Sequence, residues 1–124
     1  MNLQGDALKK LKARYECPVE LALEFVGGKW KTVILALLKE SPLRYSELRA
    51  RIPLIADKIL TESLKDLEAL ELVEKTPLVE GAAILVYRLT ERGQSLRPIL
   101  DALYAWGKNI SATLPVTIKG ISPC

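Results

Sequence analysis

The chain has 124 residues, a length that allows one domain with at most short helical arms. Apolar residues make up 49% and charged residues 27%, which is the balance of an ordinary globular protein and excludes a disordered chain. The longest unbroken aliphatic run, Val33–Leu38, is far too short to cross a bilayer. The first residues carry no basic-then-apolar secretory signature. We therefore expect a cytoplasmic protein with no membrane-spanning segment.

Histidine, the commonest general base and metal ligand, is absent from the sequence. The two cysteines, Cys17 and Cys124, lie near opposite ends, so the ligands of a structural zinc site are missing. Gly28-Lys29-Trp30 lacks the Ser or Thr of a phosphate-binding loop, and Gly93-Gln94-Ser95 lacks the second half of a nucleophile elbow. The sequence predicts a protein that is not an enzyme and that holds no metal or cofactor; Cys124 is expected to be an incidental thiol.

The net charge of +3 is unevenly distributed. The stretch from Lys29 to Lys65 holds eight basic and four acidic residues, whereas the rest of the chain holds 10 basic and 11 acidic residues. All of the positive excess therefore lies in one stretch, as expected of a protein that meets a polyanion through a single surface.

The first forty residues predict three helices. The first, at about 3–16, is short and weakly periodic, so it needs a partner surface, and we interpret residues 1–16 as a dimerisation arm. The second begins at Pro18, a residue suited to the first helical position, with Glu20 placed to reach back to the helix start, and it ends at Gly27-Gly28. The third carries a complete apolar stripe: Trp30, Val33, Ile34, Leu37 and Leu38.

A short helix at about Tyr45–Arg51 and a longer one at about Asp57–Leu70 follow, separated by the break at Pro53. The inward stripe of the longer helix is Leu60, Leu64 and Leu67, and the opposite side is expected to carry Lys58, Thr61, Glu62 and Lys65. On periodicity alone, such a polar face is more often an ordinary solvated surface than a binding surface.

Residues 72–76 and 84–89 are rich in aliphatic side chains and predict the two strands of a hairpin. Thr90 is placed to cap a last long helix, which Pro98 is expected to kink. The apolar face of this helix is Leu96, Ile99, Leu100, Leu103 and Ile110, joined by Tyr104 and Trp106. Trp30 and Trp106 are expected in core or dimer packing, and residues 115–124 are expected to form a flexible tail.

This order of elements is the layout of a winged helix-turn-helix, a mainly α fold with a small β-hairpin wing. In that layout the longer helix enters the major groove of DNA, which is about 12 Å wide and admits one helix. Lys58, Thr61, Glu62 and Lys65 suit this position, because Glu62 can accept from a cytosine amino group and the others are cationic or short and polar. Phosphate contacts are expected from Lys29, Arg44, Arg49, Arg51, Lys58 and Lys65.

The sequence also resembles the HxlR family of bacterial transcriptional regulators, which are MarR-like winged-helix dimers. The resemblance covers about residues 17–108 and rests on the order of several blocks: Cys17-Pro18-Val19-Glu20, Gly27-Gly28-Lys29-Trp30, Arg44-Tyr45-Ser46-Glu47-Leu48, K-x-L-T-x-x-L-x-x-L-E from Lys58 to Glu68, Leu89-Thr90-Glu91-x-Gly93 and Trp106-Gly107. It implies a homodimer on a palindromic operator, with dimer contacts from the terminal helices. The winged-helix domain would then span residues 17–114, including a C-terminal dimerisation helix.

Four positions depart from the family pattern. Ala56 stands where a serine is frequent at the start of the recognition helix, which makes Asp57 a candidate helix cap, and Ser63 replaces a frequent arginine on that helix. Glu71 replaces the glycine that usually ends the recognition helix and would be strained in a left-handed conformation. The second wing strand, Ala82–Tyr87, is apolar and has no cation before Arg88. A second function therefore stays open: a winged-helix protein-interaction module without specific DNA binding, in which this strand pairs with a partner.

Cys17 matches, by the same resemblance, the N-terminal cysteine that senses oxidants or electrophiles in some family members. A thiolate at the helix start would face unpaired amides and the positive end of the helix dipole, which favours the reactive form. Lys12 and Arg14 would add to this effect, whereas Glu16 and Glu20 would oppose it. The alternative is a buried, inert cysteine. The expected partners are thus double-stranded DNA, a second copy of the chain and a small-molecule effector or oxidant.

Overall fold

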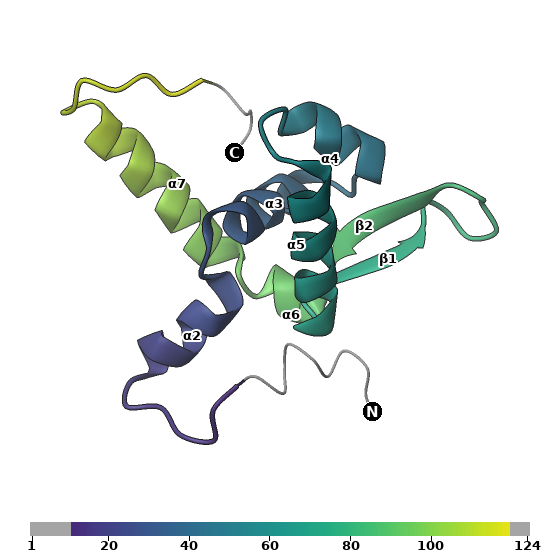
Figure 1. Ribbon diagram of the computed structural model, residues 1–124, viewed down its shortest axis with the longest axis horizontal. Helices are drawn as coiled ribbons and strands as arrows, with labels where there is room; N and C mark the ends of the chain where they lie inside the picture. The colour runs from purple at the N-terminus through teal and green to yellow at the C-terminus, as the bar shows by residue number, and fades with distance from the viewer. Residues whose placement is uncertain (1–10, 120–124) are drawn as a thin grey trace.

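The computed structural model describes residues 11–119 and has the predicted winged helix-turn-helix layout (Figure 1). The elements are α2 (Pro18–Val26), α3 (Lys29–Glu40), α4 (Tyr45–Arg51), α5 (Asp57–Ala69), β1 (Val73–Pro77), β2 (Leu85–Leu89), α6 (Glu91–Gln94) and α7 (Arg97–Ser111). Within residues 11–119, no helix has the length and apolarity that a membrane span needs.

The segment before α2 differs from the expected helix at 3–16. Residues 11–16 are not helical, and residues 1–10 lie outside the described part of the chain. The break has a local cause, because Pro18 disfavours a helical conformation in the residue before it, and Cys17 is extended with φ −148° and ψ 138°. The segment is instead held against α2 by Tyr15, whose hydroxyl donates to Glu24 Oε2 at 3.2 Å.

Helix α3 lies at the centre of the core. It contacts α5, β2 and α7, and both Ile34 and Leu35 are completely buried. The predicted apolar stripe omitted Leu35 because it assumed a helix covered on one side only. A helix with neighbours on several sides buries a wider arc than the stripe of a surface helix.

One arginine connects the two helices of the helix-turn-helix. Arg49 Nε lies 2.6 Å from Asp57 Oδ1, and Arg49 Nη1 donates to the carbonyl oxygen of Ile55 at 3.0 Å. The prediction that Asp57 caps α5 is therefore wrong: Ala56 occupies the N-cap position, and the Asp57 carboxylate turns back toward α4. Arg49 thus joins α4 to both the turn and the first residue of α5.

The chain leaves α5 through Glu71, which has a left-handed conformation with φ 62°. Such a conformation costs a residue other than glycine about 1 kcal/mol. It is held by the backbone bond from Leu72 N to Leu67 O (3.0 Å) and by Thr90 Oγ1, which donates to the Glu71 carbonyl oxygen at 2.6 Å. This turn sends the chain directly into the wing.

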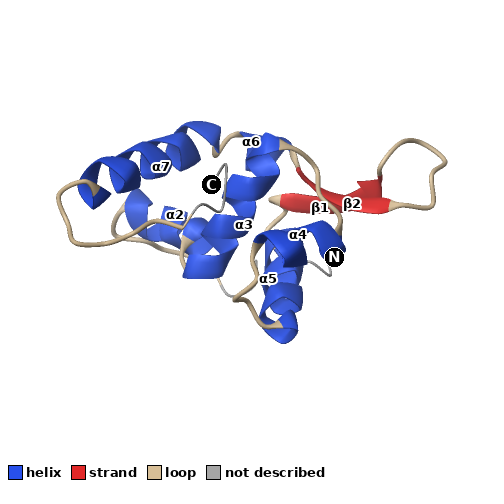
Figure 2. Cartoon of the chain, turned by 90° about the horizontal axis from the view of Figure 1, so that it is seen from above, coloured by secondary structure: helices blue, strands red, loops and turns tan. Residues whose placement is uncertain are grey.

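The wing is an antiparallel hairpin that projects beyond the helices (Figure 2). Val73 pairs with Leu89 at its base and Pro77 with Leu85 at its outer end. Leu43, just before α4, adds a short third pairing: Leu43 N donates to Tyr87 O at 3.1 Å, and Tyr87 N donates to Leu43 O at 2.8 Å. The base of the wing is therefore bonded to the start of the helix-turn-helix.

The predicted long C-terminal helix is two helices, α6 and α7. Pro98 lies in the first turn of α7 and does not kink a continuous helix, because a residue without an N–H is tolerated there. The predicted Thr90 cap is confirmed, since Thr90 Oγ1 accepts from Gly93 N at 3.0 Å. Gly93 packs so closely on Leu72, the residue before β1, that a Cβ there would collide with the Leu72 carbonyl oxygen.

Helix α7 is attached to α3 by polar contacts. Lys39 Nζ lies 2.6 Å from Asp101 Oδ1, and Arg97 Nη2 donates to the Lys39 carbonyl oxygen at 2.7 Å. The hydrogen bond with Asp101 raises the pKa of Lys39 above its ordinary value. After α7, residues 115–119 are outside any helix, and Cys124 lies outside the described residues.

Replacing Arg49 by Met should lower the free energy of unfolding by about 1 kcal/mol, because the Ile55 carbonyl oxygen loses its donor and Asp57 loses its cation. Urea unfolding followed by circular dichroism measures the change. Lys58→Met is the matched control, since Lys58 is an exposed cation in the first turn of α5, and it should leave the midpoint unchanged. Equal effects of the two substitutions would contradict the role given to Arg49.

Candidate nucleic-acid interface

The outer face of α5 is solvent-accessible along its length. Lys58, Glu62 and Lys65 are exposed, and the leucines behind them (Leu60, Leu64 and Leu67) are at most 1% exposed. Figure 2 shows α5 along one edge of the molecule, away from α7. Helix α5 therefore presents a polar side to solvent while its apolar side anchors it to the core.

Thr61 lies at the edge of this face and not at its centre. Successive residues are turned by about 100° in an α-helix, so Thr61 points sideways from Leu60 toward α4. It is half-buried, and its Oγ1 lies 3.3 Å from the hydroxyl oxygen of Tyr45. The same Tyr45 hydroxyl donates to Asp57 Oδ1 at 3.2 Å.

Tyr45 and Asp57 were not among the site residues expected from the sequence. Tyr45 comes three residues before Leu48 in α4, where the pattern suggested only a helix start, and Asp57 was taken for a cap. The signal that could have found them is their spacing, because Asp57 and Thr61 are one helical turn apart and face the same neighbour.

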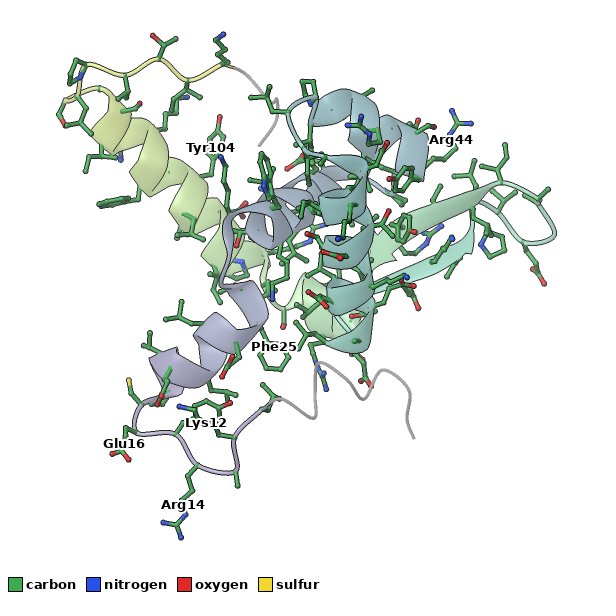
Figure 3. All side chains as sticks on the ribbon, in the orientation of Figure 1. Lys12, Arg14, Glu16, Phe25, Arg44 and Tyr104 are labelled. Atoms are coloured by element: carbon green, nitrogen blue, oxygen red, sulfur yellow. The ribbon has the colours of Figure 1, made fainter. Side chains whose placement is uncertain are left out.

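The expected phosphate-binding arginines of α4 fall into different environments. Arg44 is half-exposed at the start of α4 and points away from the body of the molecule (Figure 3). Its backbone N–H donates to Glu47 Oε1 at 2.7 Å, and its Nε lies 3.7 Å from the same oxygen. Arg49 is engaged with Asp57 and the turn, and Arg51 is half-buried. Arg44 is thus the most accessible cation of this helix.

Lys29 lies at the opposite end of α3 from α4. Its Nζ is 4.5 Å from the centre of the Trp30 ring. The rise of an α-helix separates Lys29 from Glu40, near which α4 begins, by about 16 Å. The structure therefore does not bring Lys29 together with the cations of α4 and α5 within one subunit's helix-turn-helix.

The wing carries cations on its strands and aliphatic side chains at its tip. Arg88 Nε donates to Thr76 Oγ1 at 2.8 Å, and Lys75 Nζ lies 5.6 Å from the centre of the Tyr87 ring. The tip exposes four large aliphatic side chains, namely Leu78 (47%), Val79 (63%), Ile84 (44%) and Leu85 (45%). Arg88 is thus used within the hairpin, and the tip itself is apolar, as the sequence indicated.

Cys17 is an exposed free cysteine at the N-cap of α2, which excludes the alternative of a buried, inert thiol. Glu20 reaches back as expected and accepts from the backbone N–H of Glu16 at 3.0 Å. That bond and the hydrogen bond from Lys12 (3.1 Å) lower the pKa of the Glu20 carboxyl. Lys12, which was expected to assist the thiolate, is therefore paired with Glu20.

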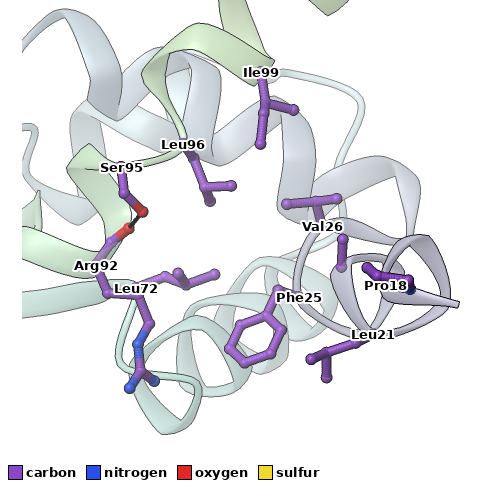
Figure 4. Close-up of a pocket in the computed structure, with 10 residues that line it drawn as sticks. Pro18, Leu21, Phe25, Val26, Leu72, Arg92, Ser95, Leu96 and Ile99 are labelled. Carbon is purple, nitrogen blue, oxygen red and sulfur yellow. Dashed lines mark hydrogen bonds between the residues drawn. The ribbon is translucent and has the colours of Figure 1, made fainter. Parts of the chain in front are cut away.

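A pocket of about 320 Å³ lies between α2 and the α6–α7 segment (Figure 4). Leu21, Phe25, Leu96 and Ile99 supply apolar walls. Arg92 lies at its edge, where Nη1 donates to the Leu70 carbonyl oxygen at 2.9 Å. The pocket is continuous with apolar side chains that α2 and α7 expose to solvent.

Comparison with known proteins identifies relatives that share most of this fold. An uncharacterised helix-turn-helix transcriptional regulator of Methanothermobacter thermautotrophicus is 46% identical over 94 residues, which cover 76% of this chain and 72% of the relative. The structure of the redox regulator HypR in its oxidised form matches with a TM-score of 0.68 and 34% identity, covering 75% of this chain and 96% of HypR.

The reduced form of the transcriptional regulator YodB from Bacillus subtilis matches with a TM-score of 0.64 and 35% identity, covering 77% of this chain and 94% of YodB. The family model described as HxlR-like helix-turn-helix matches residues 25–114. That match runs from the end of α2 through the helix-turn-helix and the wing to the end of α7. The chain therefore belongs to the HxlR-like helix-turn-helix family and is a DNA-binding transcriptional regulator.

Proposed function

We propose that this regulator is a cytoplasmic homodimer that binds a palindromic operator and inserts α5 of each protomer into a major groove. The observation that carries the proposal is the exposed outer face of α5 with its buried leucine stripe. A helix anchored in this way can enter a groove without rearrangement of the core. Half-sites about one helical turn of DNA apart would fit two protomers related by a two-fold axis.

The residues proposed to contact DNA are divided by their environment. Lys58, Glu62 and Lys65 are exposed and can reach base edges or phosphates from α5, and Thr61 can do so from the edge of that face. Arg44, at the start of α4, and Arg51, at its end, are proposed to contact phosphates. Arg49 would act mainly by orienting α5, and Lys29 would add to the general positive field.

Operator binding should weaken steeply with salt, because each phosphate neutralised by a cation releases counterions. Lys65→Ala should lower the affinity and reduce the slope of log K against log salt by about one. Fluorescence anisotropy with a labelled duplex of the DNA upstream of the gene measures both quantities. A slope near zero for the parent protein would argue against the DNA-binding proposal.

The aliphatic wing tip favours a second candidate, a winged-helix module that binds a protein partner through residues 82–87. Exposed apolar patches of this kind often mark protein-binding surfaces. This candidate would be supported if the parent showed no salt-dependent DNA binding while Leu85→Glu abolished a protein complex.

The homodimer is supported by apolar side chains that α7 exposes in the single chain. Ile99, Leu103 and Tyr104 are 46–48% exposed, and Trp106 is 65% exposed, whereas Leu100 is buried against the core. Helix α2 adds Val19, Leu21 and Leu23 near the same pocket. We propose that residues 17–114 form the winged-helix domain with α7 as its dimerisation helix, that residues 1–16 act as an arm, and that residues 115–124 form a tail.

Leu103→Glu should convert the dimer to a monomer, because it places a charge in the proposed apolar interface. Sedimentation velocity at micromolar concentration would show the change in mass. Leu78→Glu is the matched control, since Leu78 is 47% exposed and Leu103 is 48% exposed, but Leu78 lies at the wing tip. A parent protein that sediments as a monomer would refute the dimer.

We further propose that oxidation or alkylation of Cys17 changes operator affinity. HypR is a redox regulator and YodB has been solved with a bound quinone, and Cys17 is exposed at a helix start. Treatment with diamide should alter operator binding of the parent and of Cys124→Ser, and should leave Cys17→Ser unchanged. If Cys17→Ser responds as the parent does, the sensing role is lost.

A further inference from the structure

Tyr45, Asp57 and Thr61 meet at the junction of α4 and α5, and together their side chains have only two hydrogens to donate in hydrogen bonds. The Tyr45 hydroxyl oxygen lies 3.2 Å from Asp57 Oδ1 and 3.3 Å from Thr61 Oγ1. Asp57 Oδ1 also receives Arg49 Nε at 2.6 Å. Tyr45 and Thr61 bring one hydroxyl hydrogen each, and a carboxylate brings none.

This count fixes the direction of the two hydrogen bonds. The Asp57 carboxylate can only accept, so the Tyr45 hydroxyl must donate its single hydrogen to it. A hydrogen bond to a charged acceptor is also stronger than one between two neutral hydroxyls. The contact between Tyr45 and Thr61 can then exist only if Thr61 Oγ1 donates to the Tyr45 oxygen.

Thr61 has therefore used its hydrogen inside the protein. Thr61 Oγ1 still has a lone pair available, so toward a ligand it can only accept a hydrogen bond. Thr61 is half-buried at the edge of the α5 face that carries the exposed residues Lys58 and Glu62. In the major groove, only adenine N6 and cytosine N4 present hydrogen-bond donors.

We propose that Tyr45 is a specificity-determining residue that, by holding the Thr61 hydroxyl as an acceptor, makes the protein select adenine or cytosine at the base facing Thr61. The inference rests on the proposed insertion of α5 into the major groove. Tyr45 itself acts through Thr61 and needs no contact with a base. Without the Tyr45 hydroxyl, Thr61 is free to donate or accept and can also tolerate guanine or thymine.

The test is a selection from random duplex DNA followed by sequencing, with the parent and four variants. The parent should favour adenine or cytosine over guanine and thymine about fivefold at one position of each half-site, the value expected of one net hydrogen bond. Thr61→Val should remove the preference at that position alone, and Thr61→Ser should retain it. Tyr45→Phe should reduce it to near parity while preferences at the other positions stay.

Thr113→Val is the matched control, because it removes an exposed hydroxyl that lies after α7 and, among the described residues, bonds only the Ile110 carbonyl oxygen, and it should leave the motif unchanged. Thermal unfolding of each variant separates altered base preference from lost structure, since partial unfolding lowers affinity equally for all bases. Replacing the selected adenine by purine, or cytosine by 2-pyrimidinone, removes the amino group; affinity should fall about fivefold for the parent and stay the same for Thr61→Val.

Some results would overturn this inference and leave the proposed function standing. They include a motif that Thr61→Val leaves unchanged and a preference that persists in Tyr45→Phe. A preference for guanine or thymine at the position sensitive to Thr61 would do the same. Failure of the parent to enrich any motif would instead overturn the proposed function, and this inference with it.

Discussion

The placement of α5 against α4 depends on the contacts of one guanidinium group. Arg49 bonds the Ile55 carbonyl oxygen in the turn and the Asp57 carboxylate at the start of α5. The buried leucine stripe sets which side of α5 faces the core. The directional bonds of Arg49 and of Tyr45 add contacts that orient the first turn of α5 relative to α4.

These contacts divide the cations of the positive stretch into two kinds. Arg49 forms an ion pair with Asp57 inside the subunit, and Arg88 donates a hydrogen bond to Thr76 across the wing. Lys58 and Lys65, in contrast, are exposed. A count of basic residues therefore overstates the charge available to a polyanion. The outer face of α5 therefore has two accessible lysines, Lys58 and Lys65, and the proposed recognition of DNA depends on the orientation of its polar groups as well as on charge.

Much of the fold could be predicted because its signals are local. The leucine stripe of α5, the Thr90 cap and the breaks at Gly27-Gly28 and Pro53 follow from periodicity and backbone chemistry within a few residues. Three features could not be predicted, because each depends on a neighbour that the fold brings close. They are the burial of Leu35, the separation of α6 from α7 and the turn of the Asp57 carboxylate toward Arg49. The exposure of Lys58, Glu62 and Lys65 also follows from the periodicity, whereas the contacts of Tyr45 at the α4–α5 junction do not.

The pairing of Leu43 with Tyr87 has a mechanical consequence. Both backbone bonds of this bridge connect the hairpin to Leu43, two residues before α4, and Arg49 connects α4 to α5, so a displacement of the hairpin is coupled to both helices. Each subunit then has little internal freedom to adapt to operators of different spacer length. In the proposed homodimer, such adaptation would fall to the apolar interface between protomers, where side chains can slide past one another without breaking a directional bond.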